Sequence, residues 1–266
     1  MLEVETFDSN INNEWLVRQF ENYSFDGSQV IDKFIPRPYI SVVFHFKECP
    51  HFVDEISFIL DPVFLAPIIP KAISLKFQGD MDTLVVNCKA TVFSRLFILD
   101  LSPVPKRIID LPYQIFLPLW KKMAGFKNFN ERIECFTEFI NSIQPTTYVP
   151  DVVDVFYDKI VEKSITVPLK EIMRECYASK STLIRKFVKR TGVSPKTLAR
   201  IVRLNYAWGK IVNENAVDYQ DLVFYGNYFD QSHFINDFKA IIGETPGHFF
   251  RRNLDIVKIF SGKSTK

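Results

Sequence analysis

The chain has 266 residues, of which 47% are hydrophobic and 24% are charged, and this ordinary globular composition is long enough for two domains. No apolar run reaches the ~18 residues of a membrane span, and the acidic N-terminus lacks the order of a signal peptide, so we expect neither membrane insertion nor secretion. The four cysteines are widely separated and form no CxxC pair, which indicates free thiols in a reducing, cytoplasmic setting.

The small net charge of +2 conceals two parts of opposite sign. Residues 164–266 contain 17 Lys and Arg against 9 Asp and Glu, a balance of 17 − 9 = +8. Residues 1–163 contain 16 against 22, a balance of −6. The basic C-terminal part suggests a polyanionic partner for that part alone, and the alternative is a solvated basic surface.

The first hundred residues carry strand-like runs rich in Val, Ile and Phe and separated by Pro, Gly and Asp. These runs are residues 39–46, 56–60, 72–77, 83–93 and 95–101. Helical spacing begins afterwards and predicts a helical pair over residues 111–143, whose second helix has its expected N-cap at Asn130. The expected fold class is α+β, with a mostly-β N-terminal domain over residues 1–145 that includes this pair.

A candidate linker follows, because residues 144–151 (QPTTYVPD) contain two prolines and no periodicity. We place the linker and a leading helix at residues 146–163, an all-α domain at 164–255, and a tail at 256–266. The helices expected from the linker onward are 151–163, 168–176, 180–190, 195–214, 218–225, 231–241 and 246–252.

The helical part repeats itself after 51 residues. The shift superposes Leu183 on Phe234, Phe187 on Phe238, Gly192 on Gly243, Ser179 on Asp230, and Ser194-Pro195 on Thr245-Pro246. Each unit therefore predicts a short helix, a turn, a capped second helix, a left-handed glycine that closes it, and Ser/Thr-Pro at the next helix start. This is a helix-turn-helix unit made twice and joined by one long helix. Helical repeats also bind proteins, so an adaptor without DNA contact is the alternative.

The outer face of each second helix has the chemistry expected for contacts in a DNA groove. In the first unit, burial of the apolar side chains turns four others outward: Thr182, Arg185, Lys186 and Lys189. In the second unit, it leaves Gln231, Ser232 and Asn236 facing forward. Such groups can bind base edges and phosphates, so we favour double-stranded DNA over two solvated amphipathic helices.

Residues 165–252 resemble the double helix-turn-helix domain of AraC/XylS-type transcription regulators. Most of the resemblance lies in the segment DLVFYGNYFDQSHFINDFKAIIGETPGHFFR (221–251). The family pattern also matches the first unit, at S-x-x-x-L-x-R-x-F…TG-x-SP (179–195), and the connecting helix, at RLNYA (203–207). The sequence departs from the family pattern at the turn glycine, which is Asn227, and at two small alanines, which are Met173 and Val223.

The resemblance implies that helices 180–190 and 231–241 enter successive major-groove segments of one promoter, ~34 Å apart. It places base contacts at Ser181, Ile184, Arg185, Gln231, Ser232 and Asn236. The helix faces alone would place Ile184 nearer the core. Lys186, Lys189 and Arg203 are the candidates for phosphate contacts.

Residues 1–145 are more loosely similar to the sensor-like domain of some of these regulators, on FIPRPYISVVFHF (34–46) and GDMDTLVVNCKATVFSRLF (79–97). The resemblance implies a small-molecule effector or a homodimer contact in this domain, RNA polymerase as a partner, and activation of transcription. The strands can enclose a pocket for an apolar or aromatic ligand, or these side chains can simply fill a core.

Other chemistry finds little support in the sequence. His45, Cys49 and His51 would share one strand face, but Pro50 interrupts the strand and a fourth ligand is missing, so we expect no metal or other cofactor. GxSxG, HExxH and P-loop motifs are absent, so no enzyme is expected. A more distant alternative is an N-terminal enzyme domain that the C-terminal domain directs to DNA.

Overall fold

The computed structural model describes residues 2–8, 13–54, 57–102, 108–144, 147–176, 179–211, 219–251 and 254–260. The strands come first, and they are β1 (Leu2–Asp8), β2 (Val17–Phe34), β3 (Ile40–His45), β4 (His51–Val53), β5 (Ser57–Ile59), β6 (Val63–Ala66) and β7 (Ile73–Cys88). The helices follow, and they are α1 (Ala90–Leu96), α2 (Tyr113–Ala124), α3 (Phe129–Ile143), α4 (Val152–Lys163), α5 (Leu169–Arg174), α6 (Lys180–Thr191), α7 (Pro195–Ile211), α8 (Tyr219–Tyr225), α9 (Gln231–Ile242), α10 (Pro246–Phe249) and α11 (Asp255–Phe260). The predicted α+β class is therefore confirmed.

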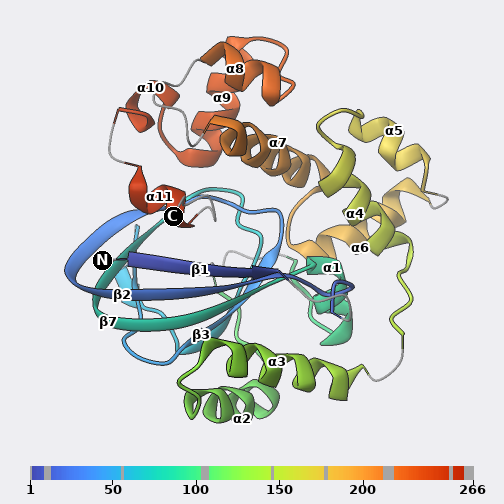
Figure 1. Ribbon diagram of the computed structural model, residues 1–266. Coiled ribbons are helices and arrows are strands. Elements are labelled where there is room, and N and C mark those ends of the chain that lie inside the picture. Colours follow the sequence, from blue (N-terminus) through green and yellow to red (C-terminus); the bar gives the residue numbers. More distant parts are fainter. Residues whose placement is uncertain are drawn as a thin grey trace.

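The N-terminal part is one antiparallel sheet in the order β1-β2-β7-β3-β6, with β4 pairing with both β5 and β7. The long strands β2 and β7 pair from Val17↔Cys88 to Phe34↔Ile73 and shift register twice along the way. Such irregularities increase the local twist and let long strands bend. Figure 1 shows both strands curving, with α2 and α3 below the sheet, α7 to α10 above it and α4 to α6 to its right.

The strand predictions succeed where apolar residues run together. The runs 39–46 and 56–60 occur as β3 and β5, and the run 72–77 joins the start of the next one in β7. The predicted strand over 95–101 is wrong, because residues 90–96 form α1. Strand β2 was not predicted, since its polar and apolar residues alternate with one face buried, a weaker signal than a continuous apolar run.

The predicted helices agree more closely with the structure. The pair over 111–143 occurs as α2 and α3, although the N-cap of α3 is Asn128, whose side chain accepts from the Asn130 N–H, and not Asn130 itself. Helix α7 is described to Ile211, and residues 212–218, where two predicted helix ends fall, lie outside the described residues. Helix α11 occupies part of the predicted tail and lies against β1 and β2.

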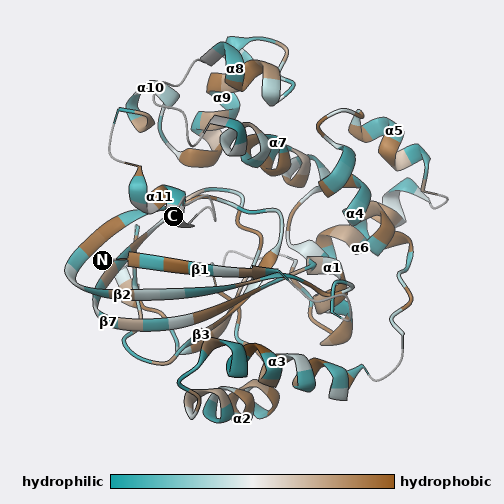
Figure 2. Cartoon of the chain, viewed as in Figure 1, coloured by the Kyte–Doolittle hydropathy of each residue, from teal (hydrophilic) through white to brown (hydrophobic). Residues whose placement is uncertain are grey.

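The hydrophobic core continues across the predicted boundary between residues 145 and 146. One cluster of buried side chains runs from Leu16 through Phe136 to Val202. A second surrounds Phe234 and includes Ile35, which follows β2. A third lines the inside of the curved sheet. The helices that contribute to these cores carry both hydrophilic and hydrophobic stretches (Figure 2). No helix in the described ranges has the length and apolarity needed to cross a bilayer.

Candidate nucleic-acid interface and effector cavity

The first helix-turn-helix unit consists of α5 and α6. Leu183 and Phe187 are buried as predicted, and α6 ends at Gly192 with φ 76°. Only glycine adopts this left-handed conformation without a steric penalty, so the predicted stop is confirmed. The Ser194 hydroxyl accepts from the Thr197 N–H at 3.0 Å, which satisfies an amide at the start of α7. Ser179, however, makes no side-chain cap to α6.

The second unit, α8 and α9, repeats this design with better caps. The Asp230 carboxylate accepts from the His233 N–H at 2.7 Å, and α9 ends at Gly243 with φ 86°. Thr245 accepts from the His248 N–H at 3.4 Å at the start of α10. Asn227 takes the left-handed turn position with φ 50°, a conformation that Asn tolerates better than most residues.

The structure leaves most of the predicted base-contacting side chains accessible. Ser181 and Arg185 of α6 are exposed, as is Lys186, whereas Thr182 and Ile184 are half-buried. In α9, Gln231, Ser232 and Asn236 are exposed. Neither Arg185 nor Asn236 is sealed beneath the N-terminal part. Their contacts with DNA remain predictions.

Two of the predicted phosphate-contacting residues already have acidic neighbours. Lys189 Nζ lies 3.7 Å from Asp100 Oδ2. The Arg203 guanidinium lies 3.7 Å from Asp237 Oδ2 and 5.2 Å from the centre of the Tyr228 ring. Arg203 is half-buried, so its present contacts hold α7 against α9. A phosphate would have to compete with Asp237 for this side chain.

The C-terminal ends of both second helices are tied to the N-terminal part. The Leu101 N–H donates to the Lys189 carbonyl of α6 at 2.7 Å, and the Ala72 N–H donates to the Ile241 carbonyl of α9 at 2.7 Å. Lys33 Nζ donates to the Ile242 carbonyl at 2.9 Å and pairs with Glu244 at 2.8 Å. These contacts satisfy carbonyls that a helix end leaves open, and the Lys33 charge suits the negative end of the α9 dipole.

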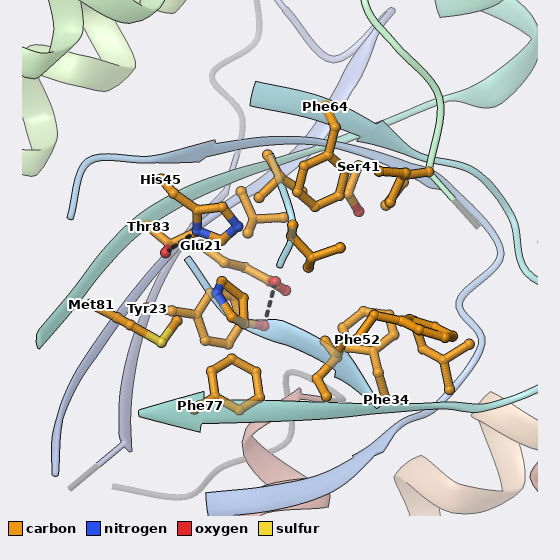
Figure 3. Close-up of a pocket in the computed structure, with 18 residues that line it drawn as sticks. Glu21, Tyr23, Phe34, Ser41, His45, Phe52, Phe64, Phe77, Met81 and Thr83 are labelled. Atoms are coloured by element: carbon orange, nitrogen blue, oxygen red, sulfur yellow. Dashed lines mark hydrogen bonds between the residues drawn. The ribbon is translucent and has the colours of Figure 1, made fainter. Parts of the chain in front are cut away.

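A cavity of about 90 Å³ lies inside the curved sheet (Figure 3). Its wall is mostly apolar and includes Phe34, Val43, Phe52, Phe64, Ile73, Leu75, Phe77 and Met81. Polar groups stand at two places. The buried Glu21 carboxylate accepts from Arg37 at 2.7 Å and from the Tyr23 hydroxyl at 2.7 Å. His45 Nδ1 lies 2.7 Å from the Thr83 hydroxyl.

Burial controls the protonation of these polar groups. It lowers the pKa of His45 to about 3, so the imidazole is neutral at physiological pH. Burial, followed by the charge of Glu21, raises the pKa of the Tyr23 hydroxyl. His45 Nε2 is buried without a hydrogen-bond partner among the described residues, and unpaired buried polar atoms are uncommon in folded proteins.

The possible metal set His45, Cys49 and His51 is not assembled in the structure. His45 contacts Thr83, and His51 Nε2 lies 3.4 Å from Gln78. Within the described ranges, no group of three or more His, Cys, Asp and Glu side chains could hold a metal ion.

Comparison with known proteins identifies the double unit. Residues 172–252 match the family of the Helix-turn-helix domain. This part of the chain is therefore a helix-turn-helix domain of the AraC type, which supports a role in binding DNA and regulating transcription. The resemblance read from residues 165–252 is confirmed. Among curated proteins, no sequence matches the chain.

Some solved structures are distantly similar. The chain is 13% identical to ToxT from Vibrio cholerae, with 94% of this chain and 97% of that chain covered and a TM-score of 0.45. For ToxT bound to (E)-4-(8-methylnaphthalen-1-yl)but-3-enoic acid, the identity is 13%, the coverage is 94% and 98%, and the TM-score is 0.47. For the AraC-like transcriptional activator CuxR, the identity is 12%, the coverage is 78% and 86%, and the TM-score is 0.27.

Proposed function

We propose that this regulator reads a promoter sequence with α6 and α9, each in its own segment of the major groove. The supporting observation is the paired construction of the two helices. Each buries its apolar face, ends at a left-handed glycine and leaves hydrogen-bonding side chains exposed. Arg185 in α6 and Asn236 in α9 suit base edges, because guanidinium and amide groups can each make two hydrogen bonds to one base.

A pair of substitutions in α6 tests this proposal. Arg185→Ala should lower the discrimination between the selected site and random duplex by ~1–3 kcal/mol, because a base contact is lost. The neighbouring control, Lys186→Ala, should weaken both duplexes alike and reduce the slope of log K against log salt by ~0.9, because a phosphate contact is lost. Titration of the full-length protein by fluorescence anisotropy measures both quantities.

The two competing functions give different results in this experiment. An equal loss on specific and random DNA for Arg185→Ala would remove Arg185 from base reading. If the wild-type protein binds no genomic fragment even at low salt, the second candidate, a helical adaptor for another protein, is favoured instead.

We further propose that a small-molecule effector in the cavity controls DNA binding. The mostly apolar wall suits a small apolar or aromatic molecule, and His45 Nε2 offers it one hydrogen bond. The wall also connects with α9. Phe34 and Ile73 line the cavity and pair across β2 and β7, and the preceding residues, Lys33 and Ala72, hold the last carbonyls of α9.

Native mass spectrometry of the purified protein tests for the effector. The expected result is a co-purifying small molecule that leaves the protein when Ala66, which lines the cavity, is enlarged by Ala66→Leu. The same variant should then change DNA affinity as removal of the ligand does. A bound molecule that persists in Ala66→Leu would place its site elsewhere.

On the resemblance alone, we also propose activation through RNA polymerase, a homodimer contact in residues 1–145, and action in the cytoplasm. The division into residues 1–145, a linker and leading helix at 146–163, and 164–255 is likewise a proposal. Transcription with purified polymerase tests the activation. Sedimentation of the full chain, compared with a chain that lacks residues 1–145, tests the homodimer contact.

A further inference from the structure

Two phenylalanines in the second unit are unusually open to solvent. Phe229 is 92% exposed and Phe224 is 78% exposed, which makes them the most exposed phenylalanines of the described residues. Phenylalanine exposed to water is unfavourable relative to its burial. At the shift of 51 residues the first unit has Met173 and Ala178 at the corresponding positions, so only the second unit carries phenylalanine at both.

The turn that carries Phe229 is firmly held. The Gly226 and Tyr228 N–H groups donate to the Leu222 and Val223 carbonyls at 3.0 and 2.9 Å. The Asn227 side chain donates to the Ile165 carbonyl at 2.7 Å. Tyr228 is buried and packs on Phe234, with ring centres 5.3 Å apart. Because Tyr228 turns inward on this rigid turn, the next residue, Phe229, is presented outward.

Phe229 also lies at the end of α9 that we expect to enter the major groove of DNA. It directly precedes Asp230, the N-cap of α9, and the exposed base-reading candidates Gln231 and Ser232 follow. An open groove of about 490 Å³ extends from Phe224 past Tyr228 to Gln231. Phe224 and the base-reading candidate Gln231 therefore line the same groove, and Phe229 lies next to the N-cap of α9 in the chain.

We propose that Phe229 reads thymine by packing on the C5-methyl group. This inference rests on the proposed function, since it places α9 in the major groove. Among the bases, thymine alone presents a methyl group there, and phenylalanine is a side chain that contacts it. DNA is favoured over a protein as the occupant because Phe229 is followed within three residues by the exposed Gln231 and Ser232 of α9 and belongs to the part of the chain with a balance of +8 (17 − 9).

Single replacement of thymine by deoxyuridine tests the inference, because it removes only the methyl group. The full-length protein first selects duplexes from a random library, and each thymine of the selected site is then replaced in turn. For the wild type, at least one replacement should weaken binding about fourfold, the value of one buried methyl group. For Phe229→Ala, the same replacement should have no effect. Ile98→Ala, a change at a residue of the N-terminal part that is 91% exposed, is the control and should behave as wild type.

The outcomes separate this inference from the proposed function. Failure of the wild type to select any sequence would remove the proposed function itself. If the wild type selects a sequence but deoxyuridine weakens the binding of Phe229→Ala as much as that of the wild type, the inference about Phe229 is wrong and the proposed function stands. The same holds if Phe229→Ala keeps the deoxyuridine effect but loses activation with purified polymerase, because Phe229 would then contact a protein.

Discussion

The two helix-turn-helix units share one local design but are attached to the molecule differently. In the first, Phe187 packs on Phe156 of α4, with ring centres 5.3 Å apart, inside a core that reaches the N-terminal sheet. In the second, Phe234 belongs to a separate core, and α9 is held to the sheet by Ala72 and Lys33. The difference teaches that the first unit shares the main core of the protein, whereas the second has a core of its own that meets the N-terminal part at Ile35, Ala72 and Lys33.

The largest expected effect comes from removing one buried ring in each unit. Phe187→Ala and Phe234→Ala should each destabilise the protein by ~3–5 kcal/mol, because both rings are fully buried. Phe187→Ala should lower the midpoint of global unfolding, since its core is shared with the sheet. Phe234→Ala should mainly accelerate amide hydrogen exchange in α8 and α9 while β7 remains protected. Matching exchange patterns in the two variants would erase the proposed difference between the units.

An intermediate effect is expected at the ionic anchor of the first unit. Arg190 donates two hydrogen bonds to Asp151, at 2.9 and 2.6 Å, where α4 begins. Arg190→Met should cost ~1.5–3 kcal/mol in the free energy of unfolding, since the bonds join charged groups. Urea titrations at pH 7, with Lys186→Met as the control at an exposed position of the same helix, measure this cost.

The cost should also depend on pH. Partial burial raises the pKa of the Asp151 carboxyl, but hydrogen bonds from Arg190 and backbone amides, with the Arg190 charge, outweigh it and lower the pKa from 3.8 to about 2. Because the folded pKa lies below the unfolded one, the contribution is fully present above pH ~4 and is lost as the pH falls towards 2. A wild-type advantage that persists undiminished at pH 2 would show that Asp151 is not the partner that matters.

The smallest effect on stability, but the one most specific to α9, should come from Lys33→Met. Loss of a cation at a helix C-terminus costs ~0.3–1 kcal/mol. Amide hydrogen exchange should rise in the last turn of α9 and not in α6. The variant should also bind DNA in which one base pair has been added between the segments that α6 and α9 contact. Lys71→Met, beside Ala72, serves as the control. No change in α9 exchange would show that Lys33 does not anchor this helix.

The sequence could predict much of the candidate interface but little of the cavity. Gly192 and Gly243 were assigned left-handed positions from residue type and the repeat, and Asn227 was assigned the turn position from the family pattern; all three have positive φ. The polar side of the cavity could not be found in this way. Glu21 and Arg37 are 16 residues apart and meet only because β2 curves back over the sheet.

What the sequence by itself determined was the double unit, its glycine stops and most of its helix starts. Helix termination and capping act over three or four residues, so residue type and spacing suffice. Only the tertiary structure decided the α1 helix at 90–96, the pairing of β2 and β7, the cavity, and the attachment of α9 to Lys33. These features depend on groups brought together from distant parts of the chain, and pairing over such separations leaves no local pattern to read.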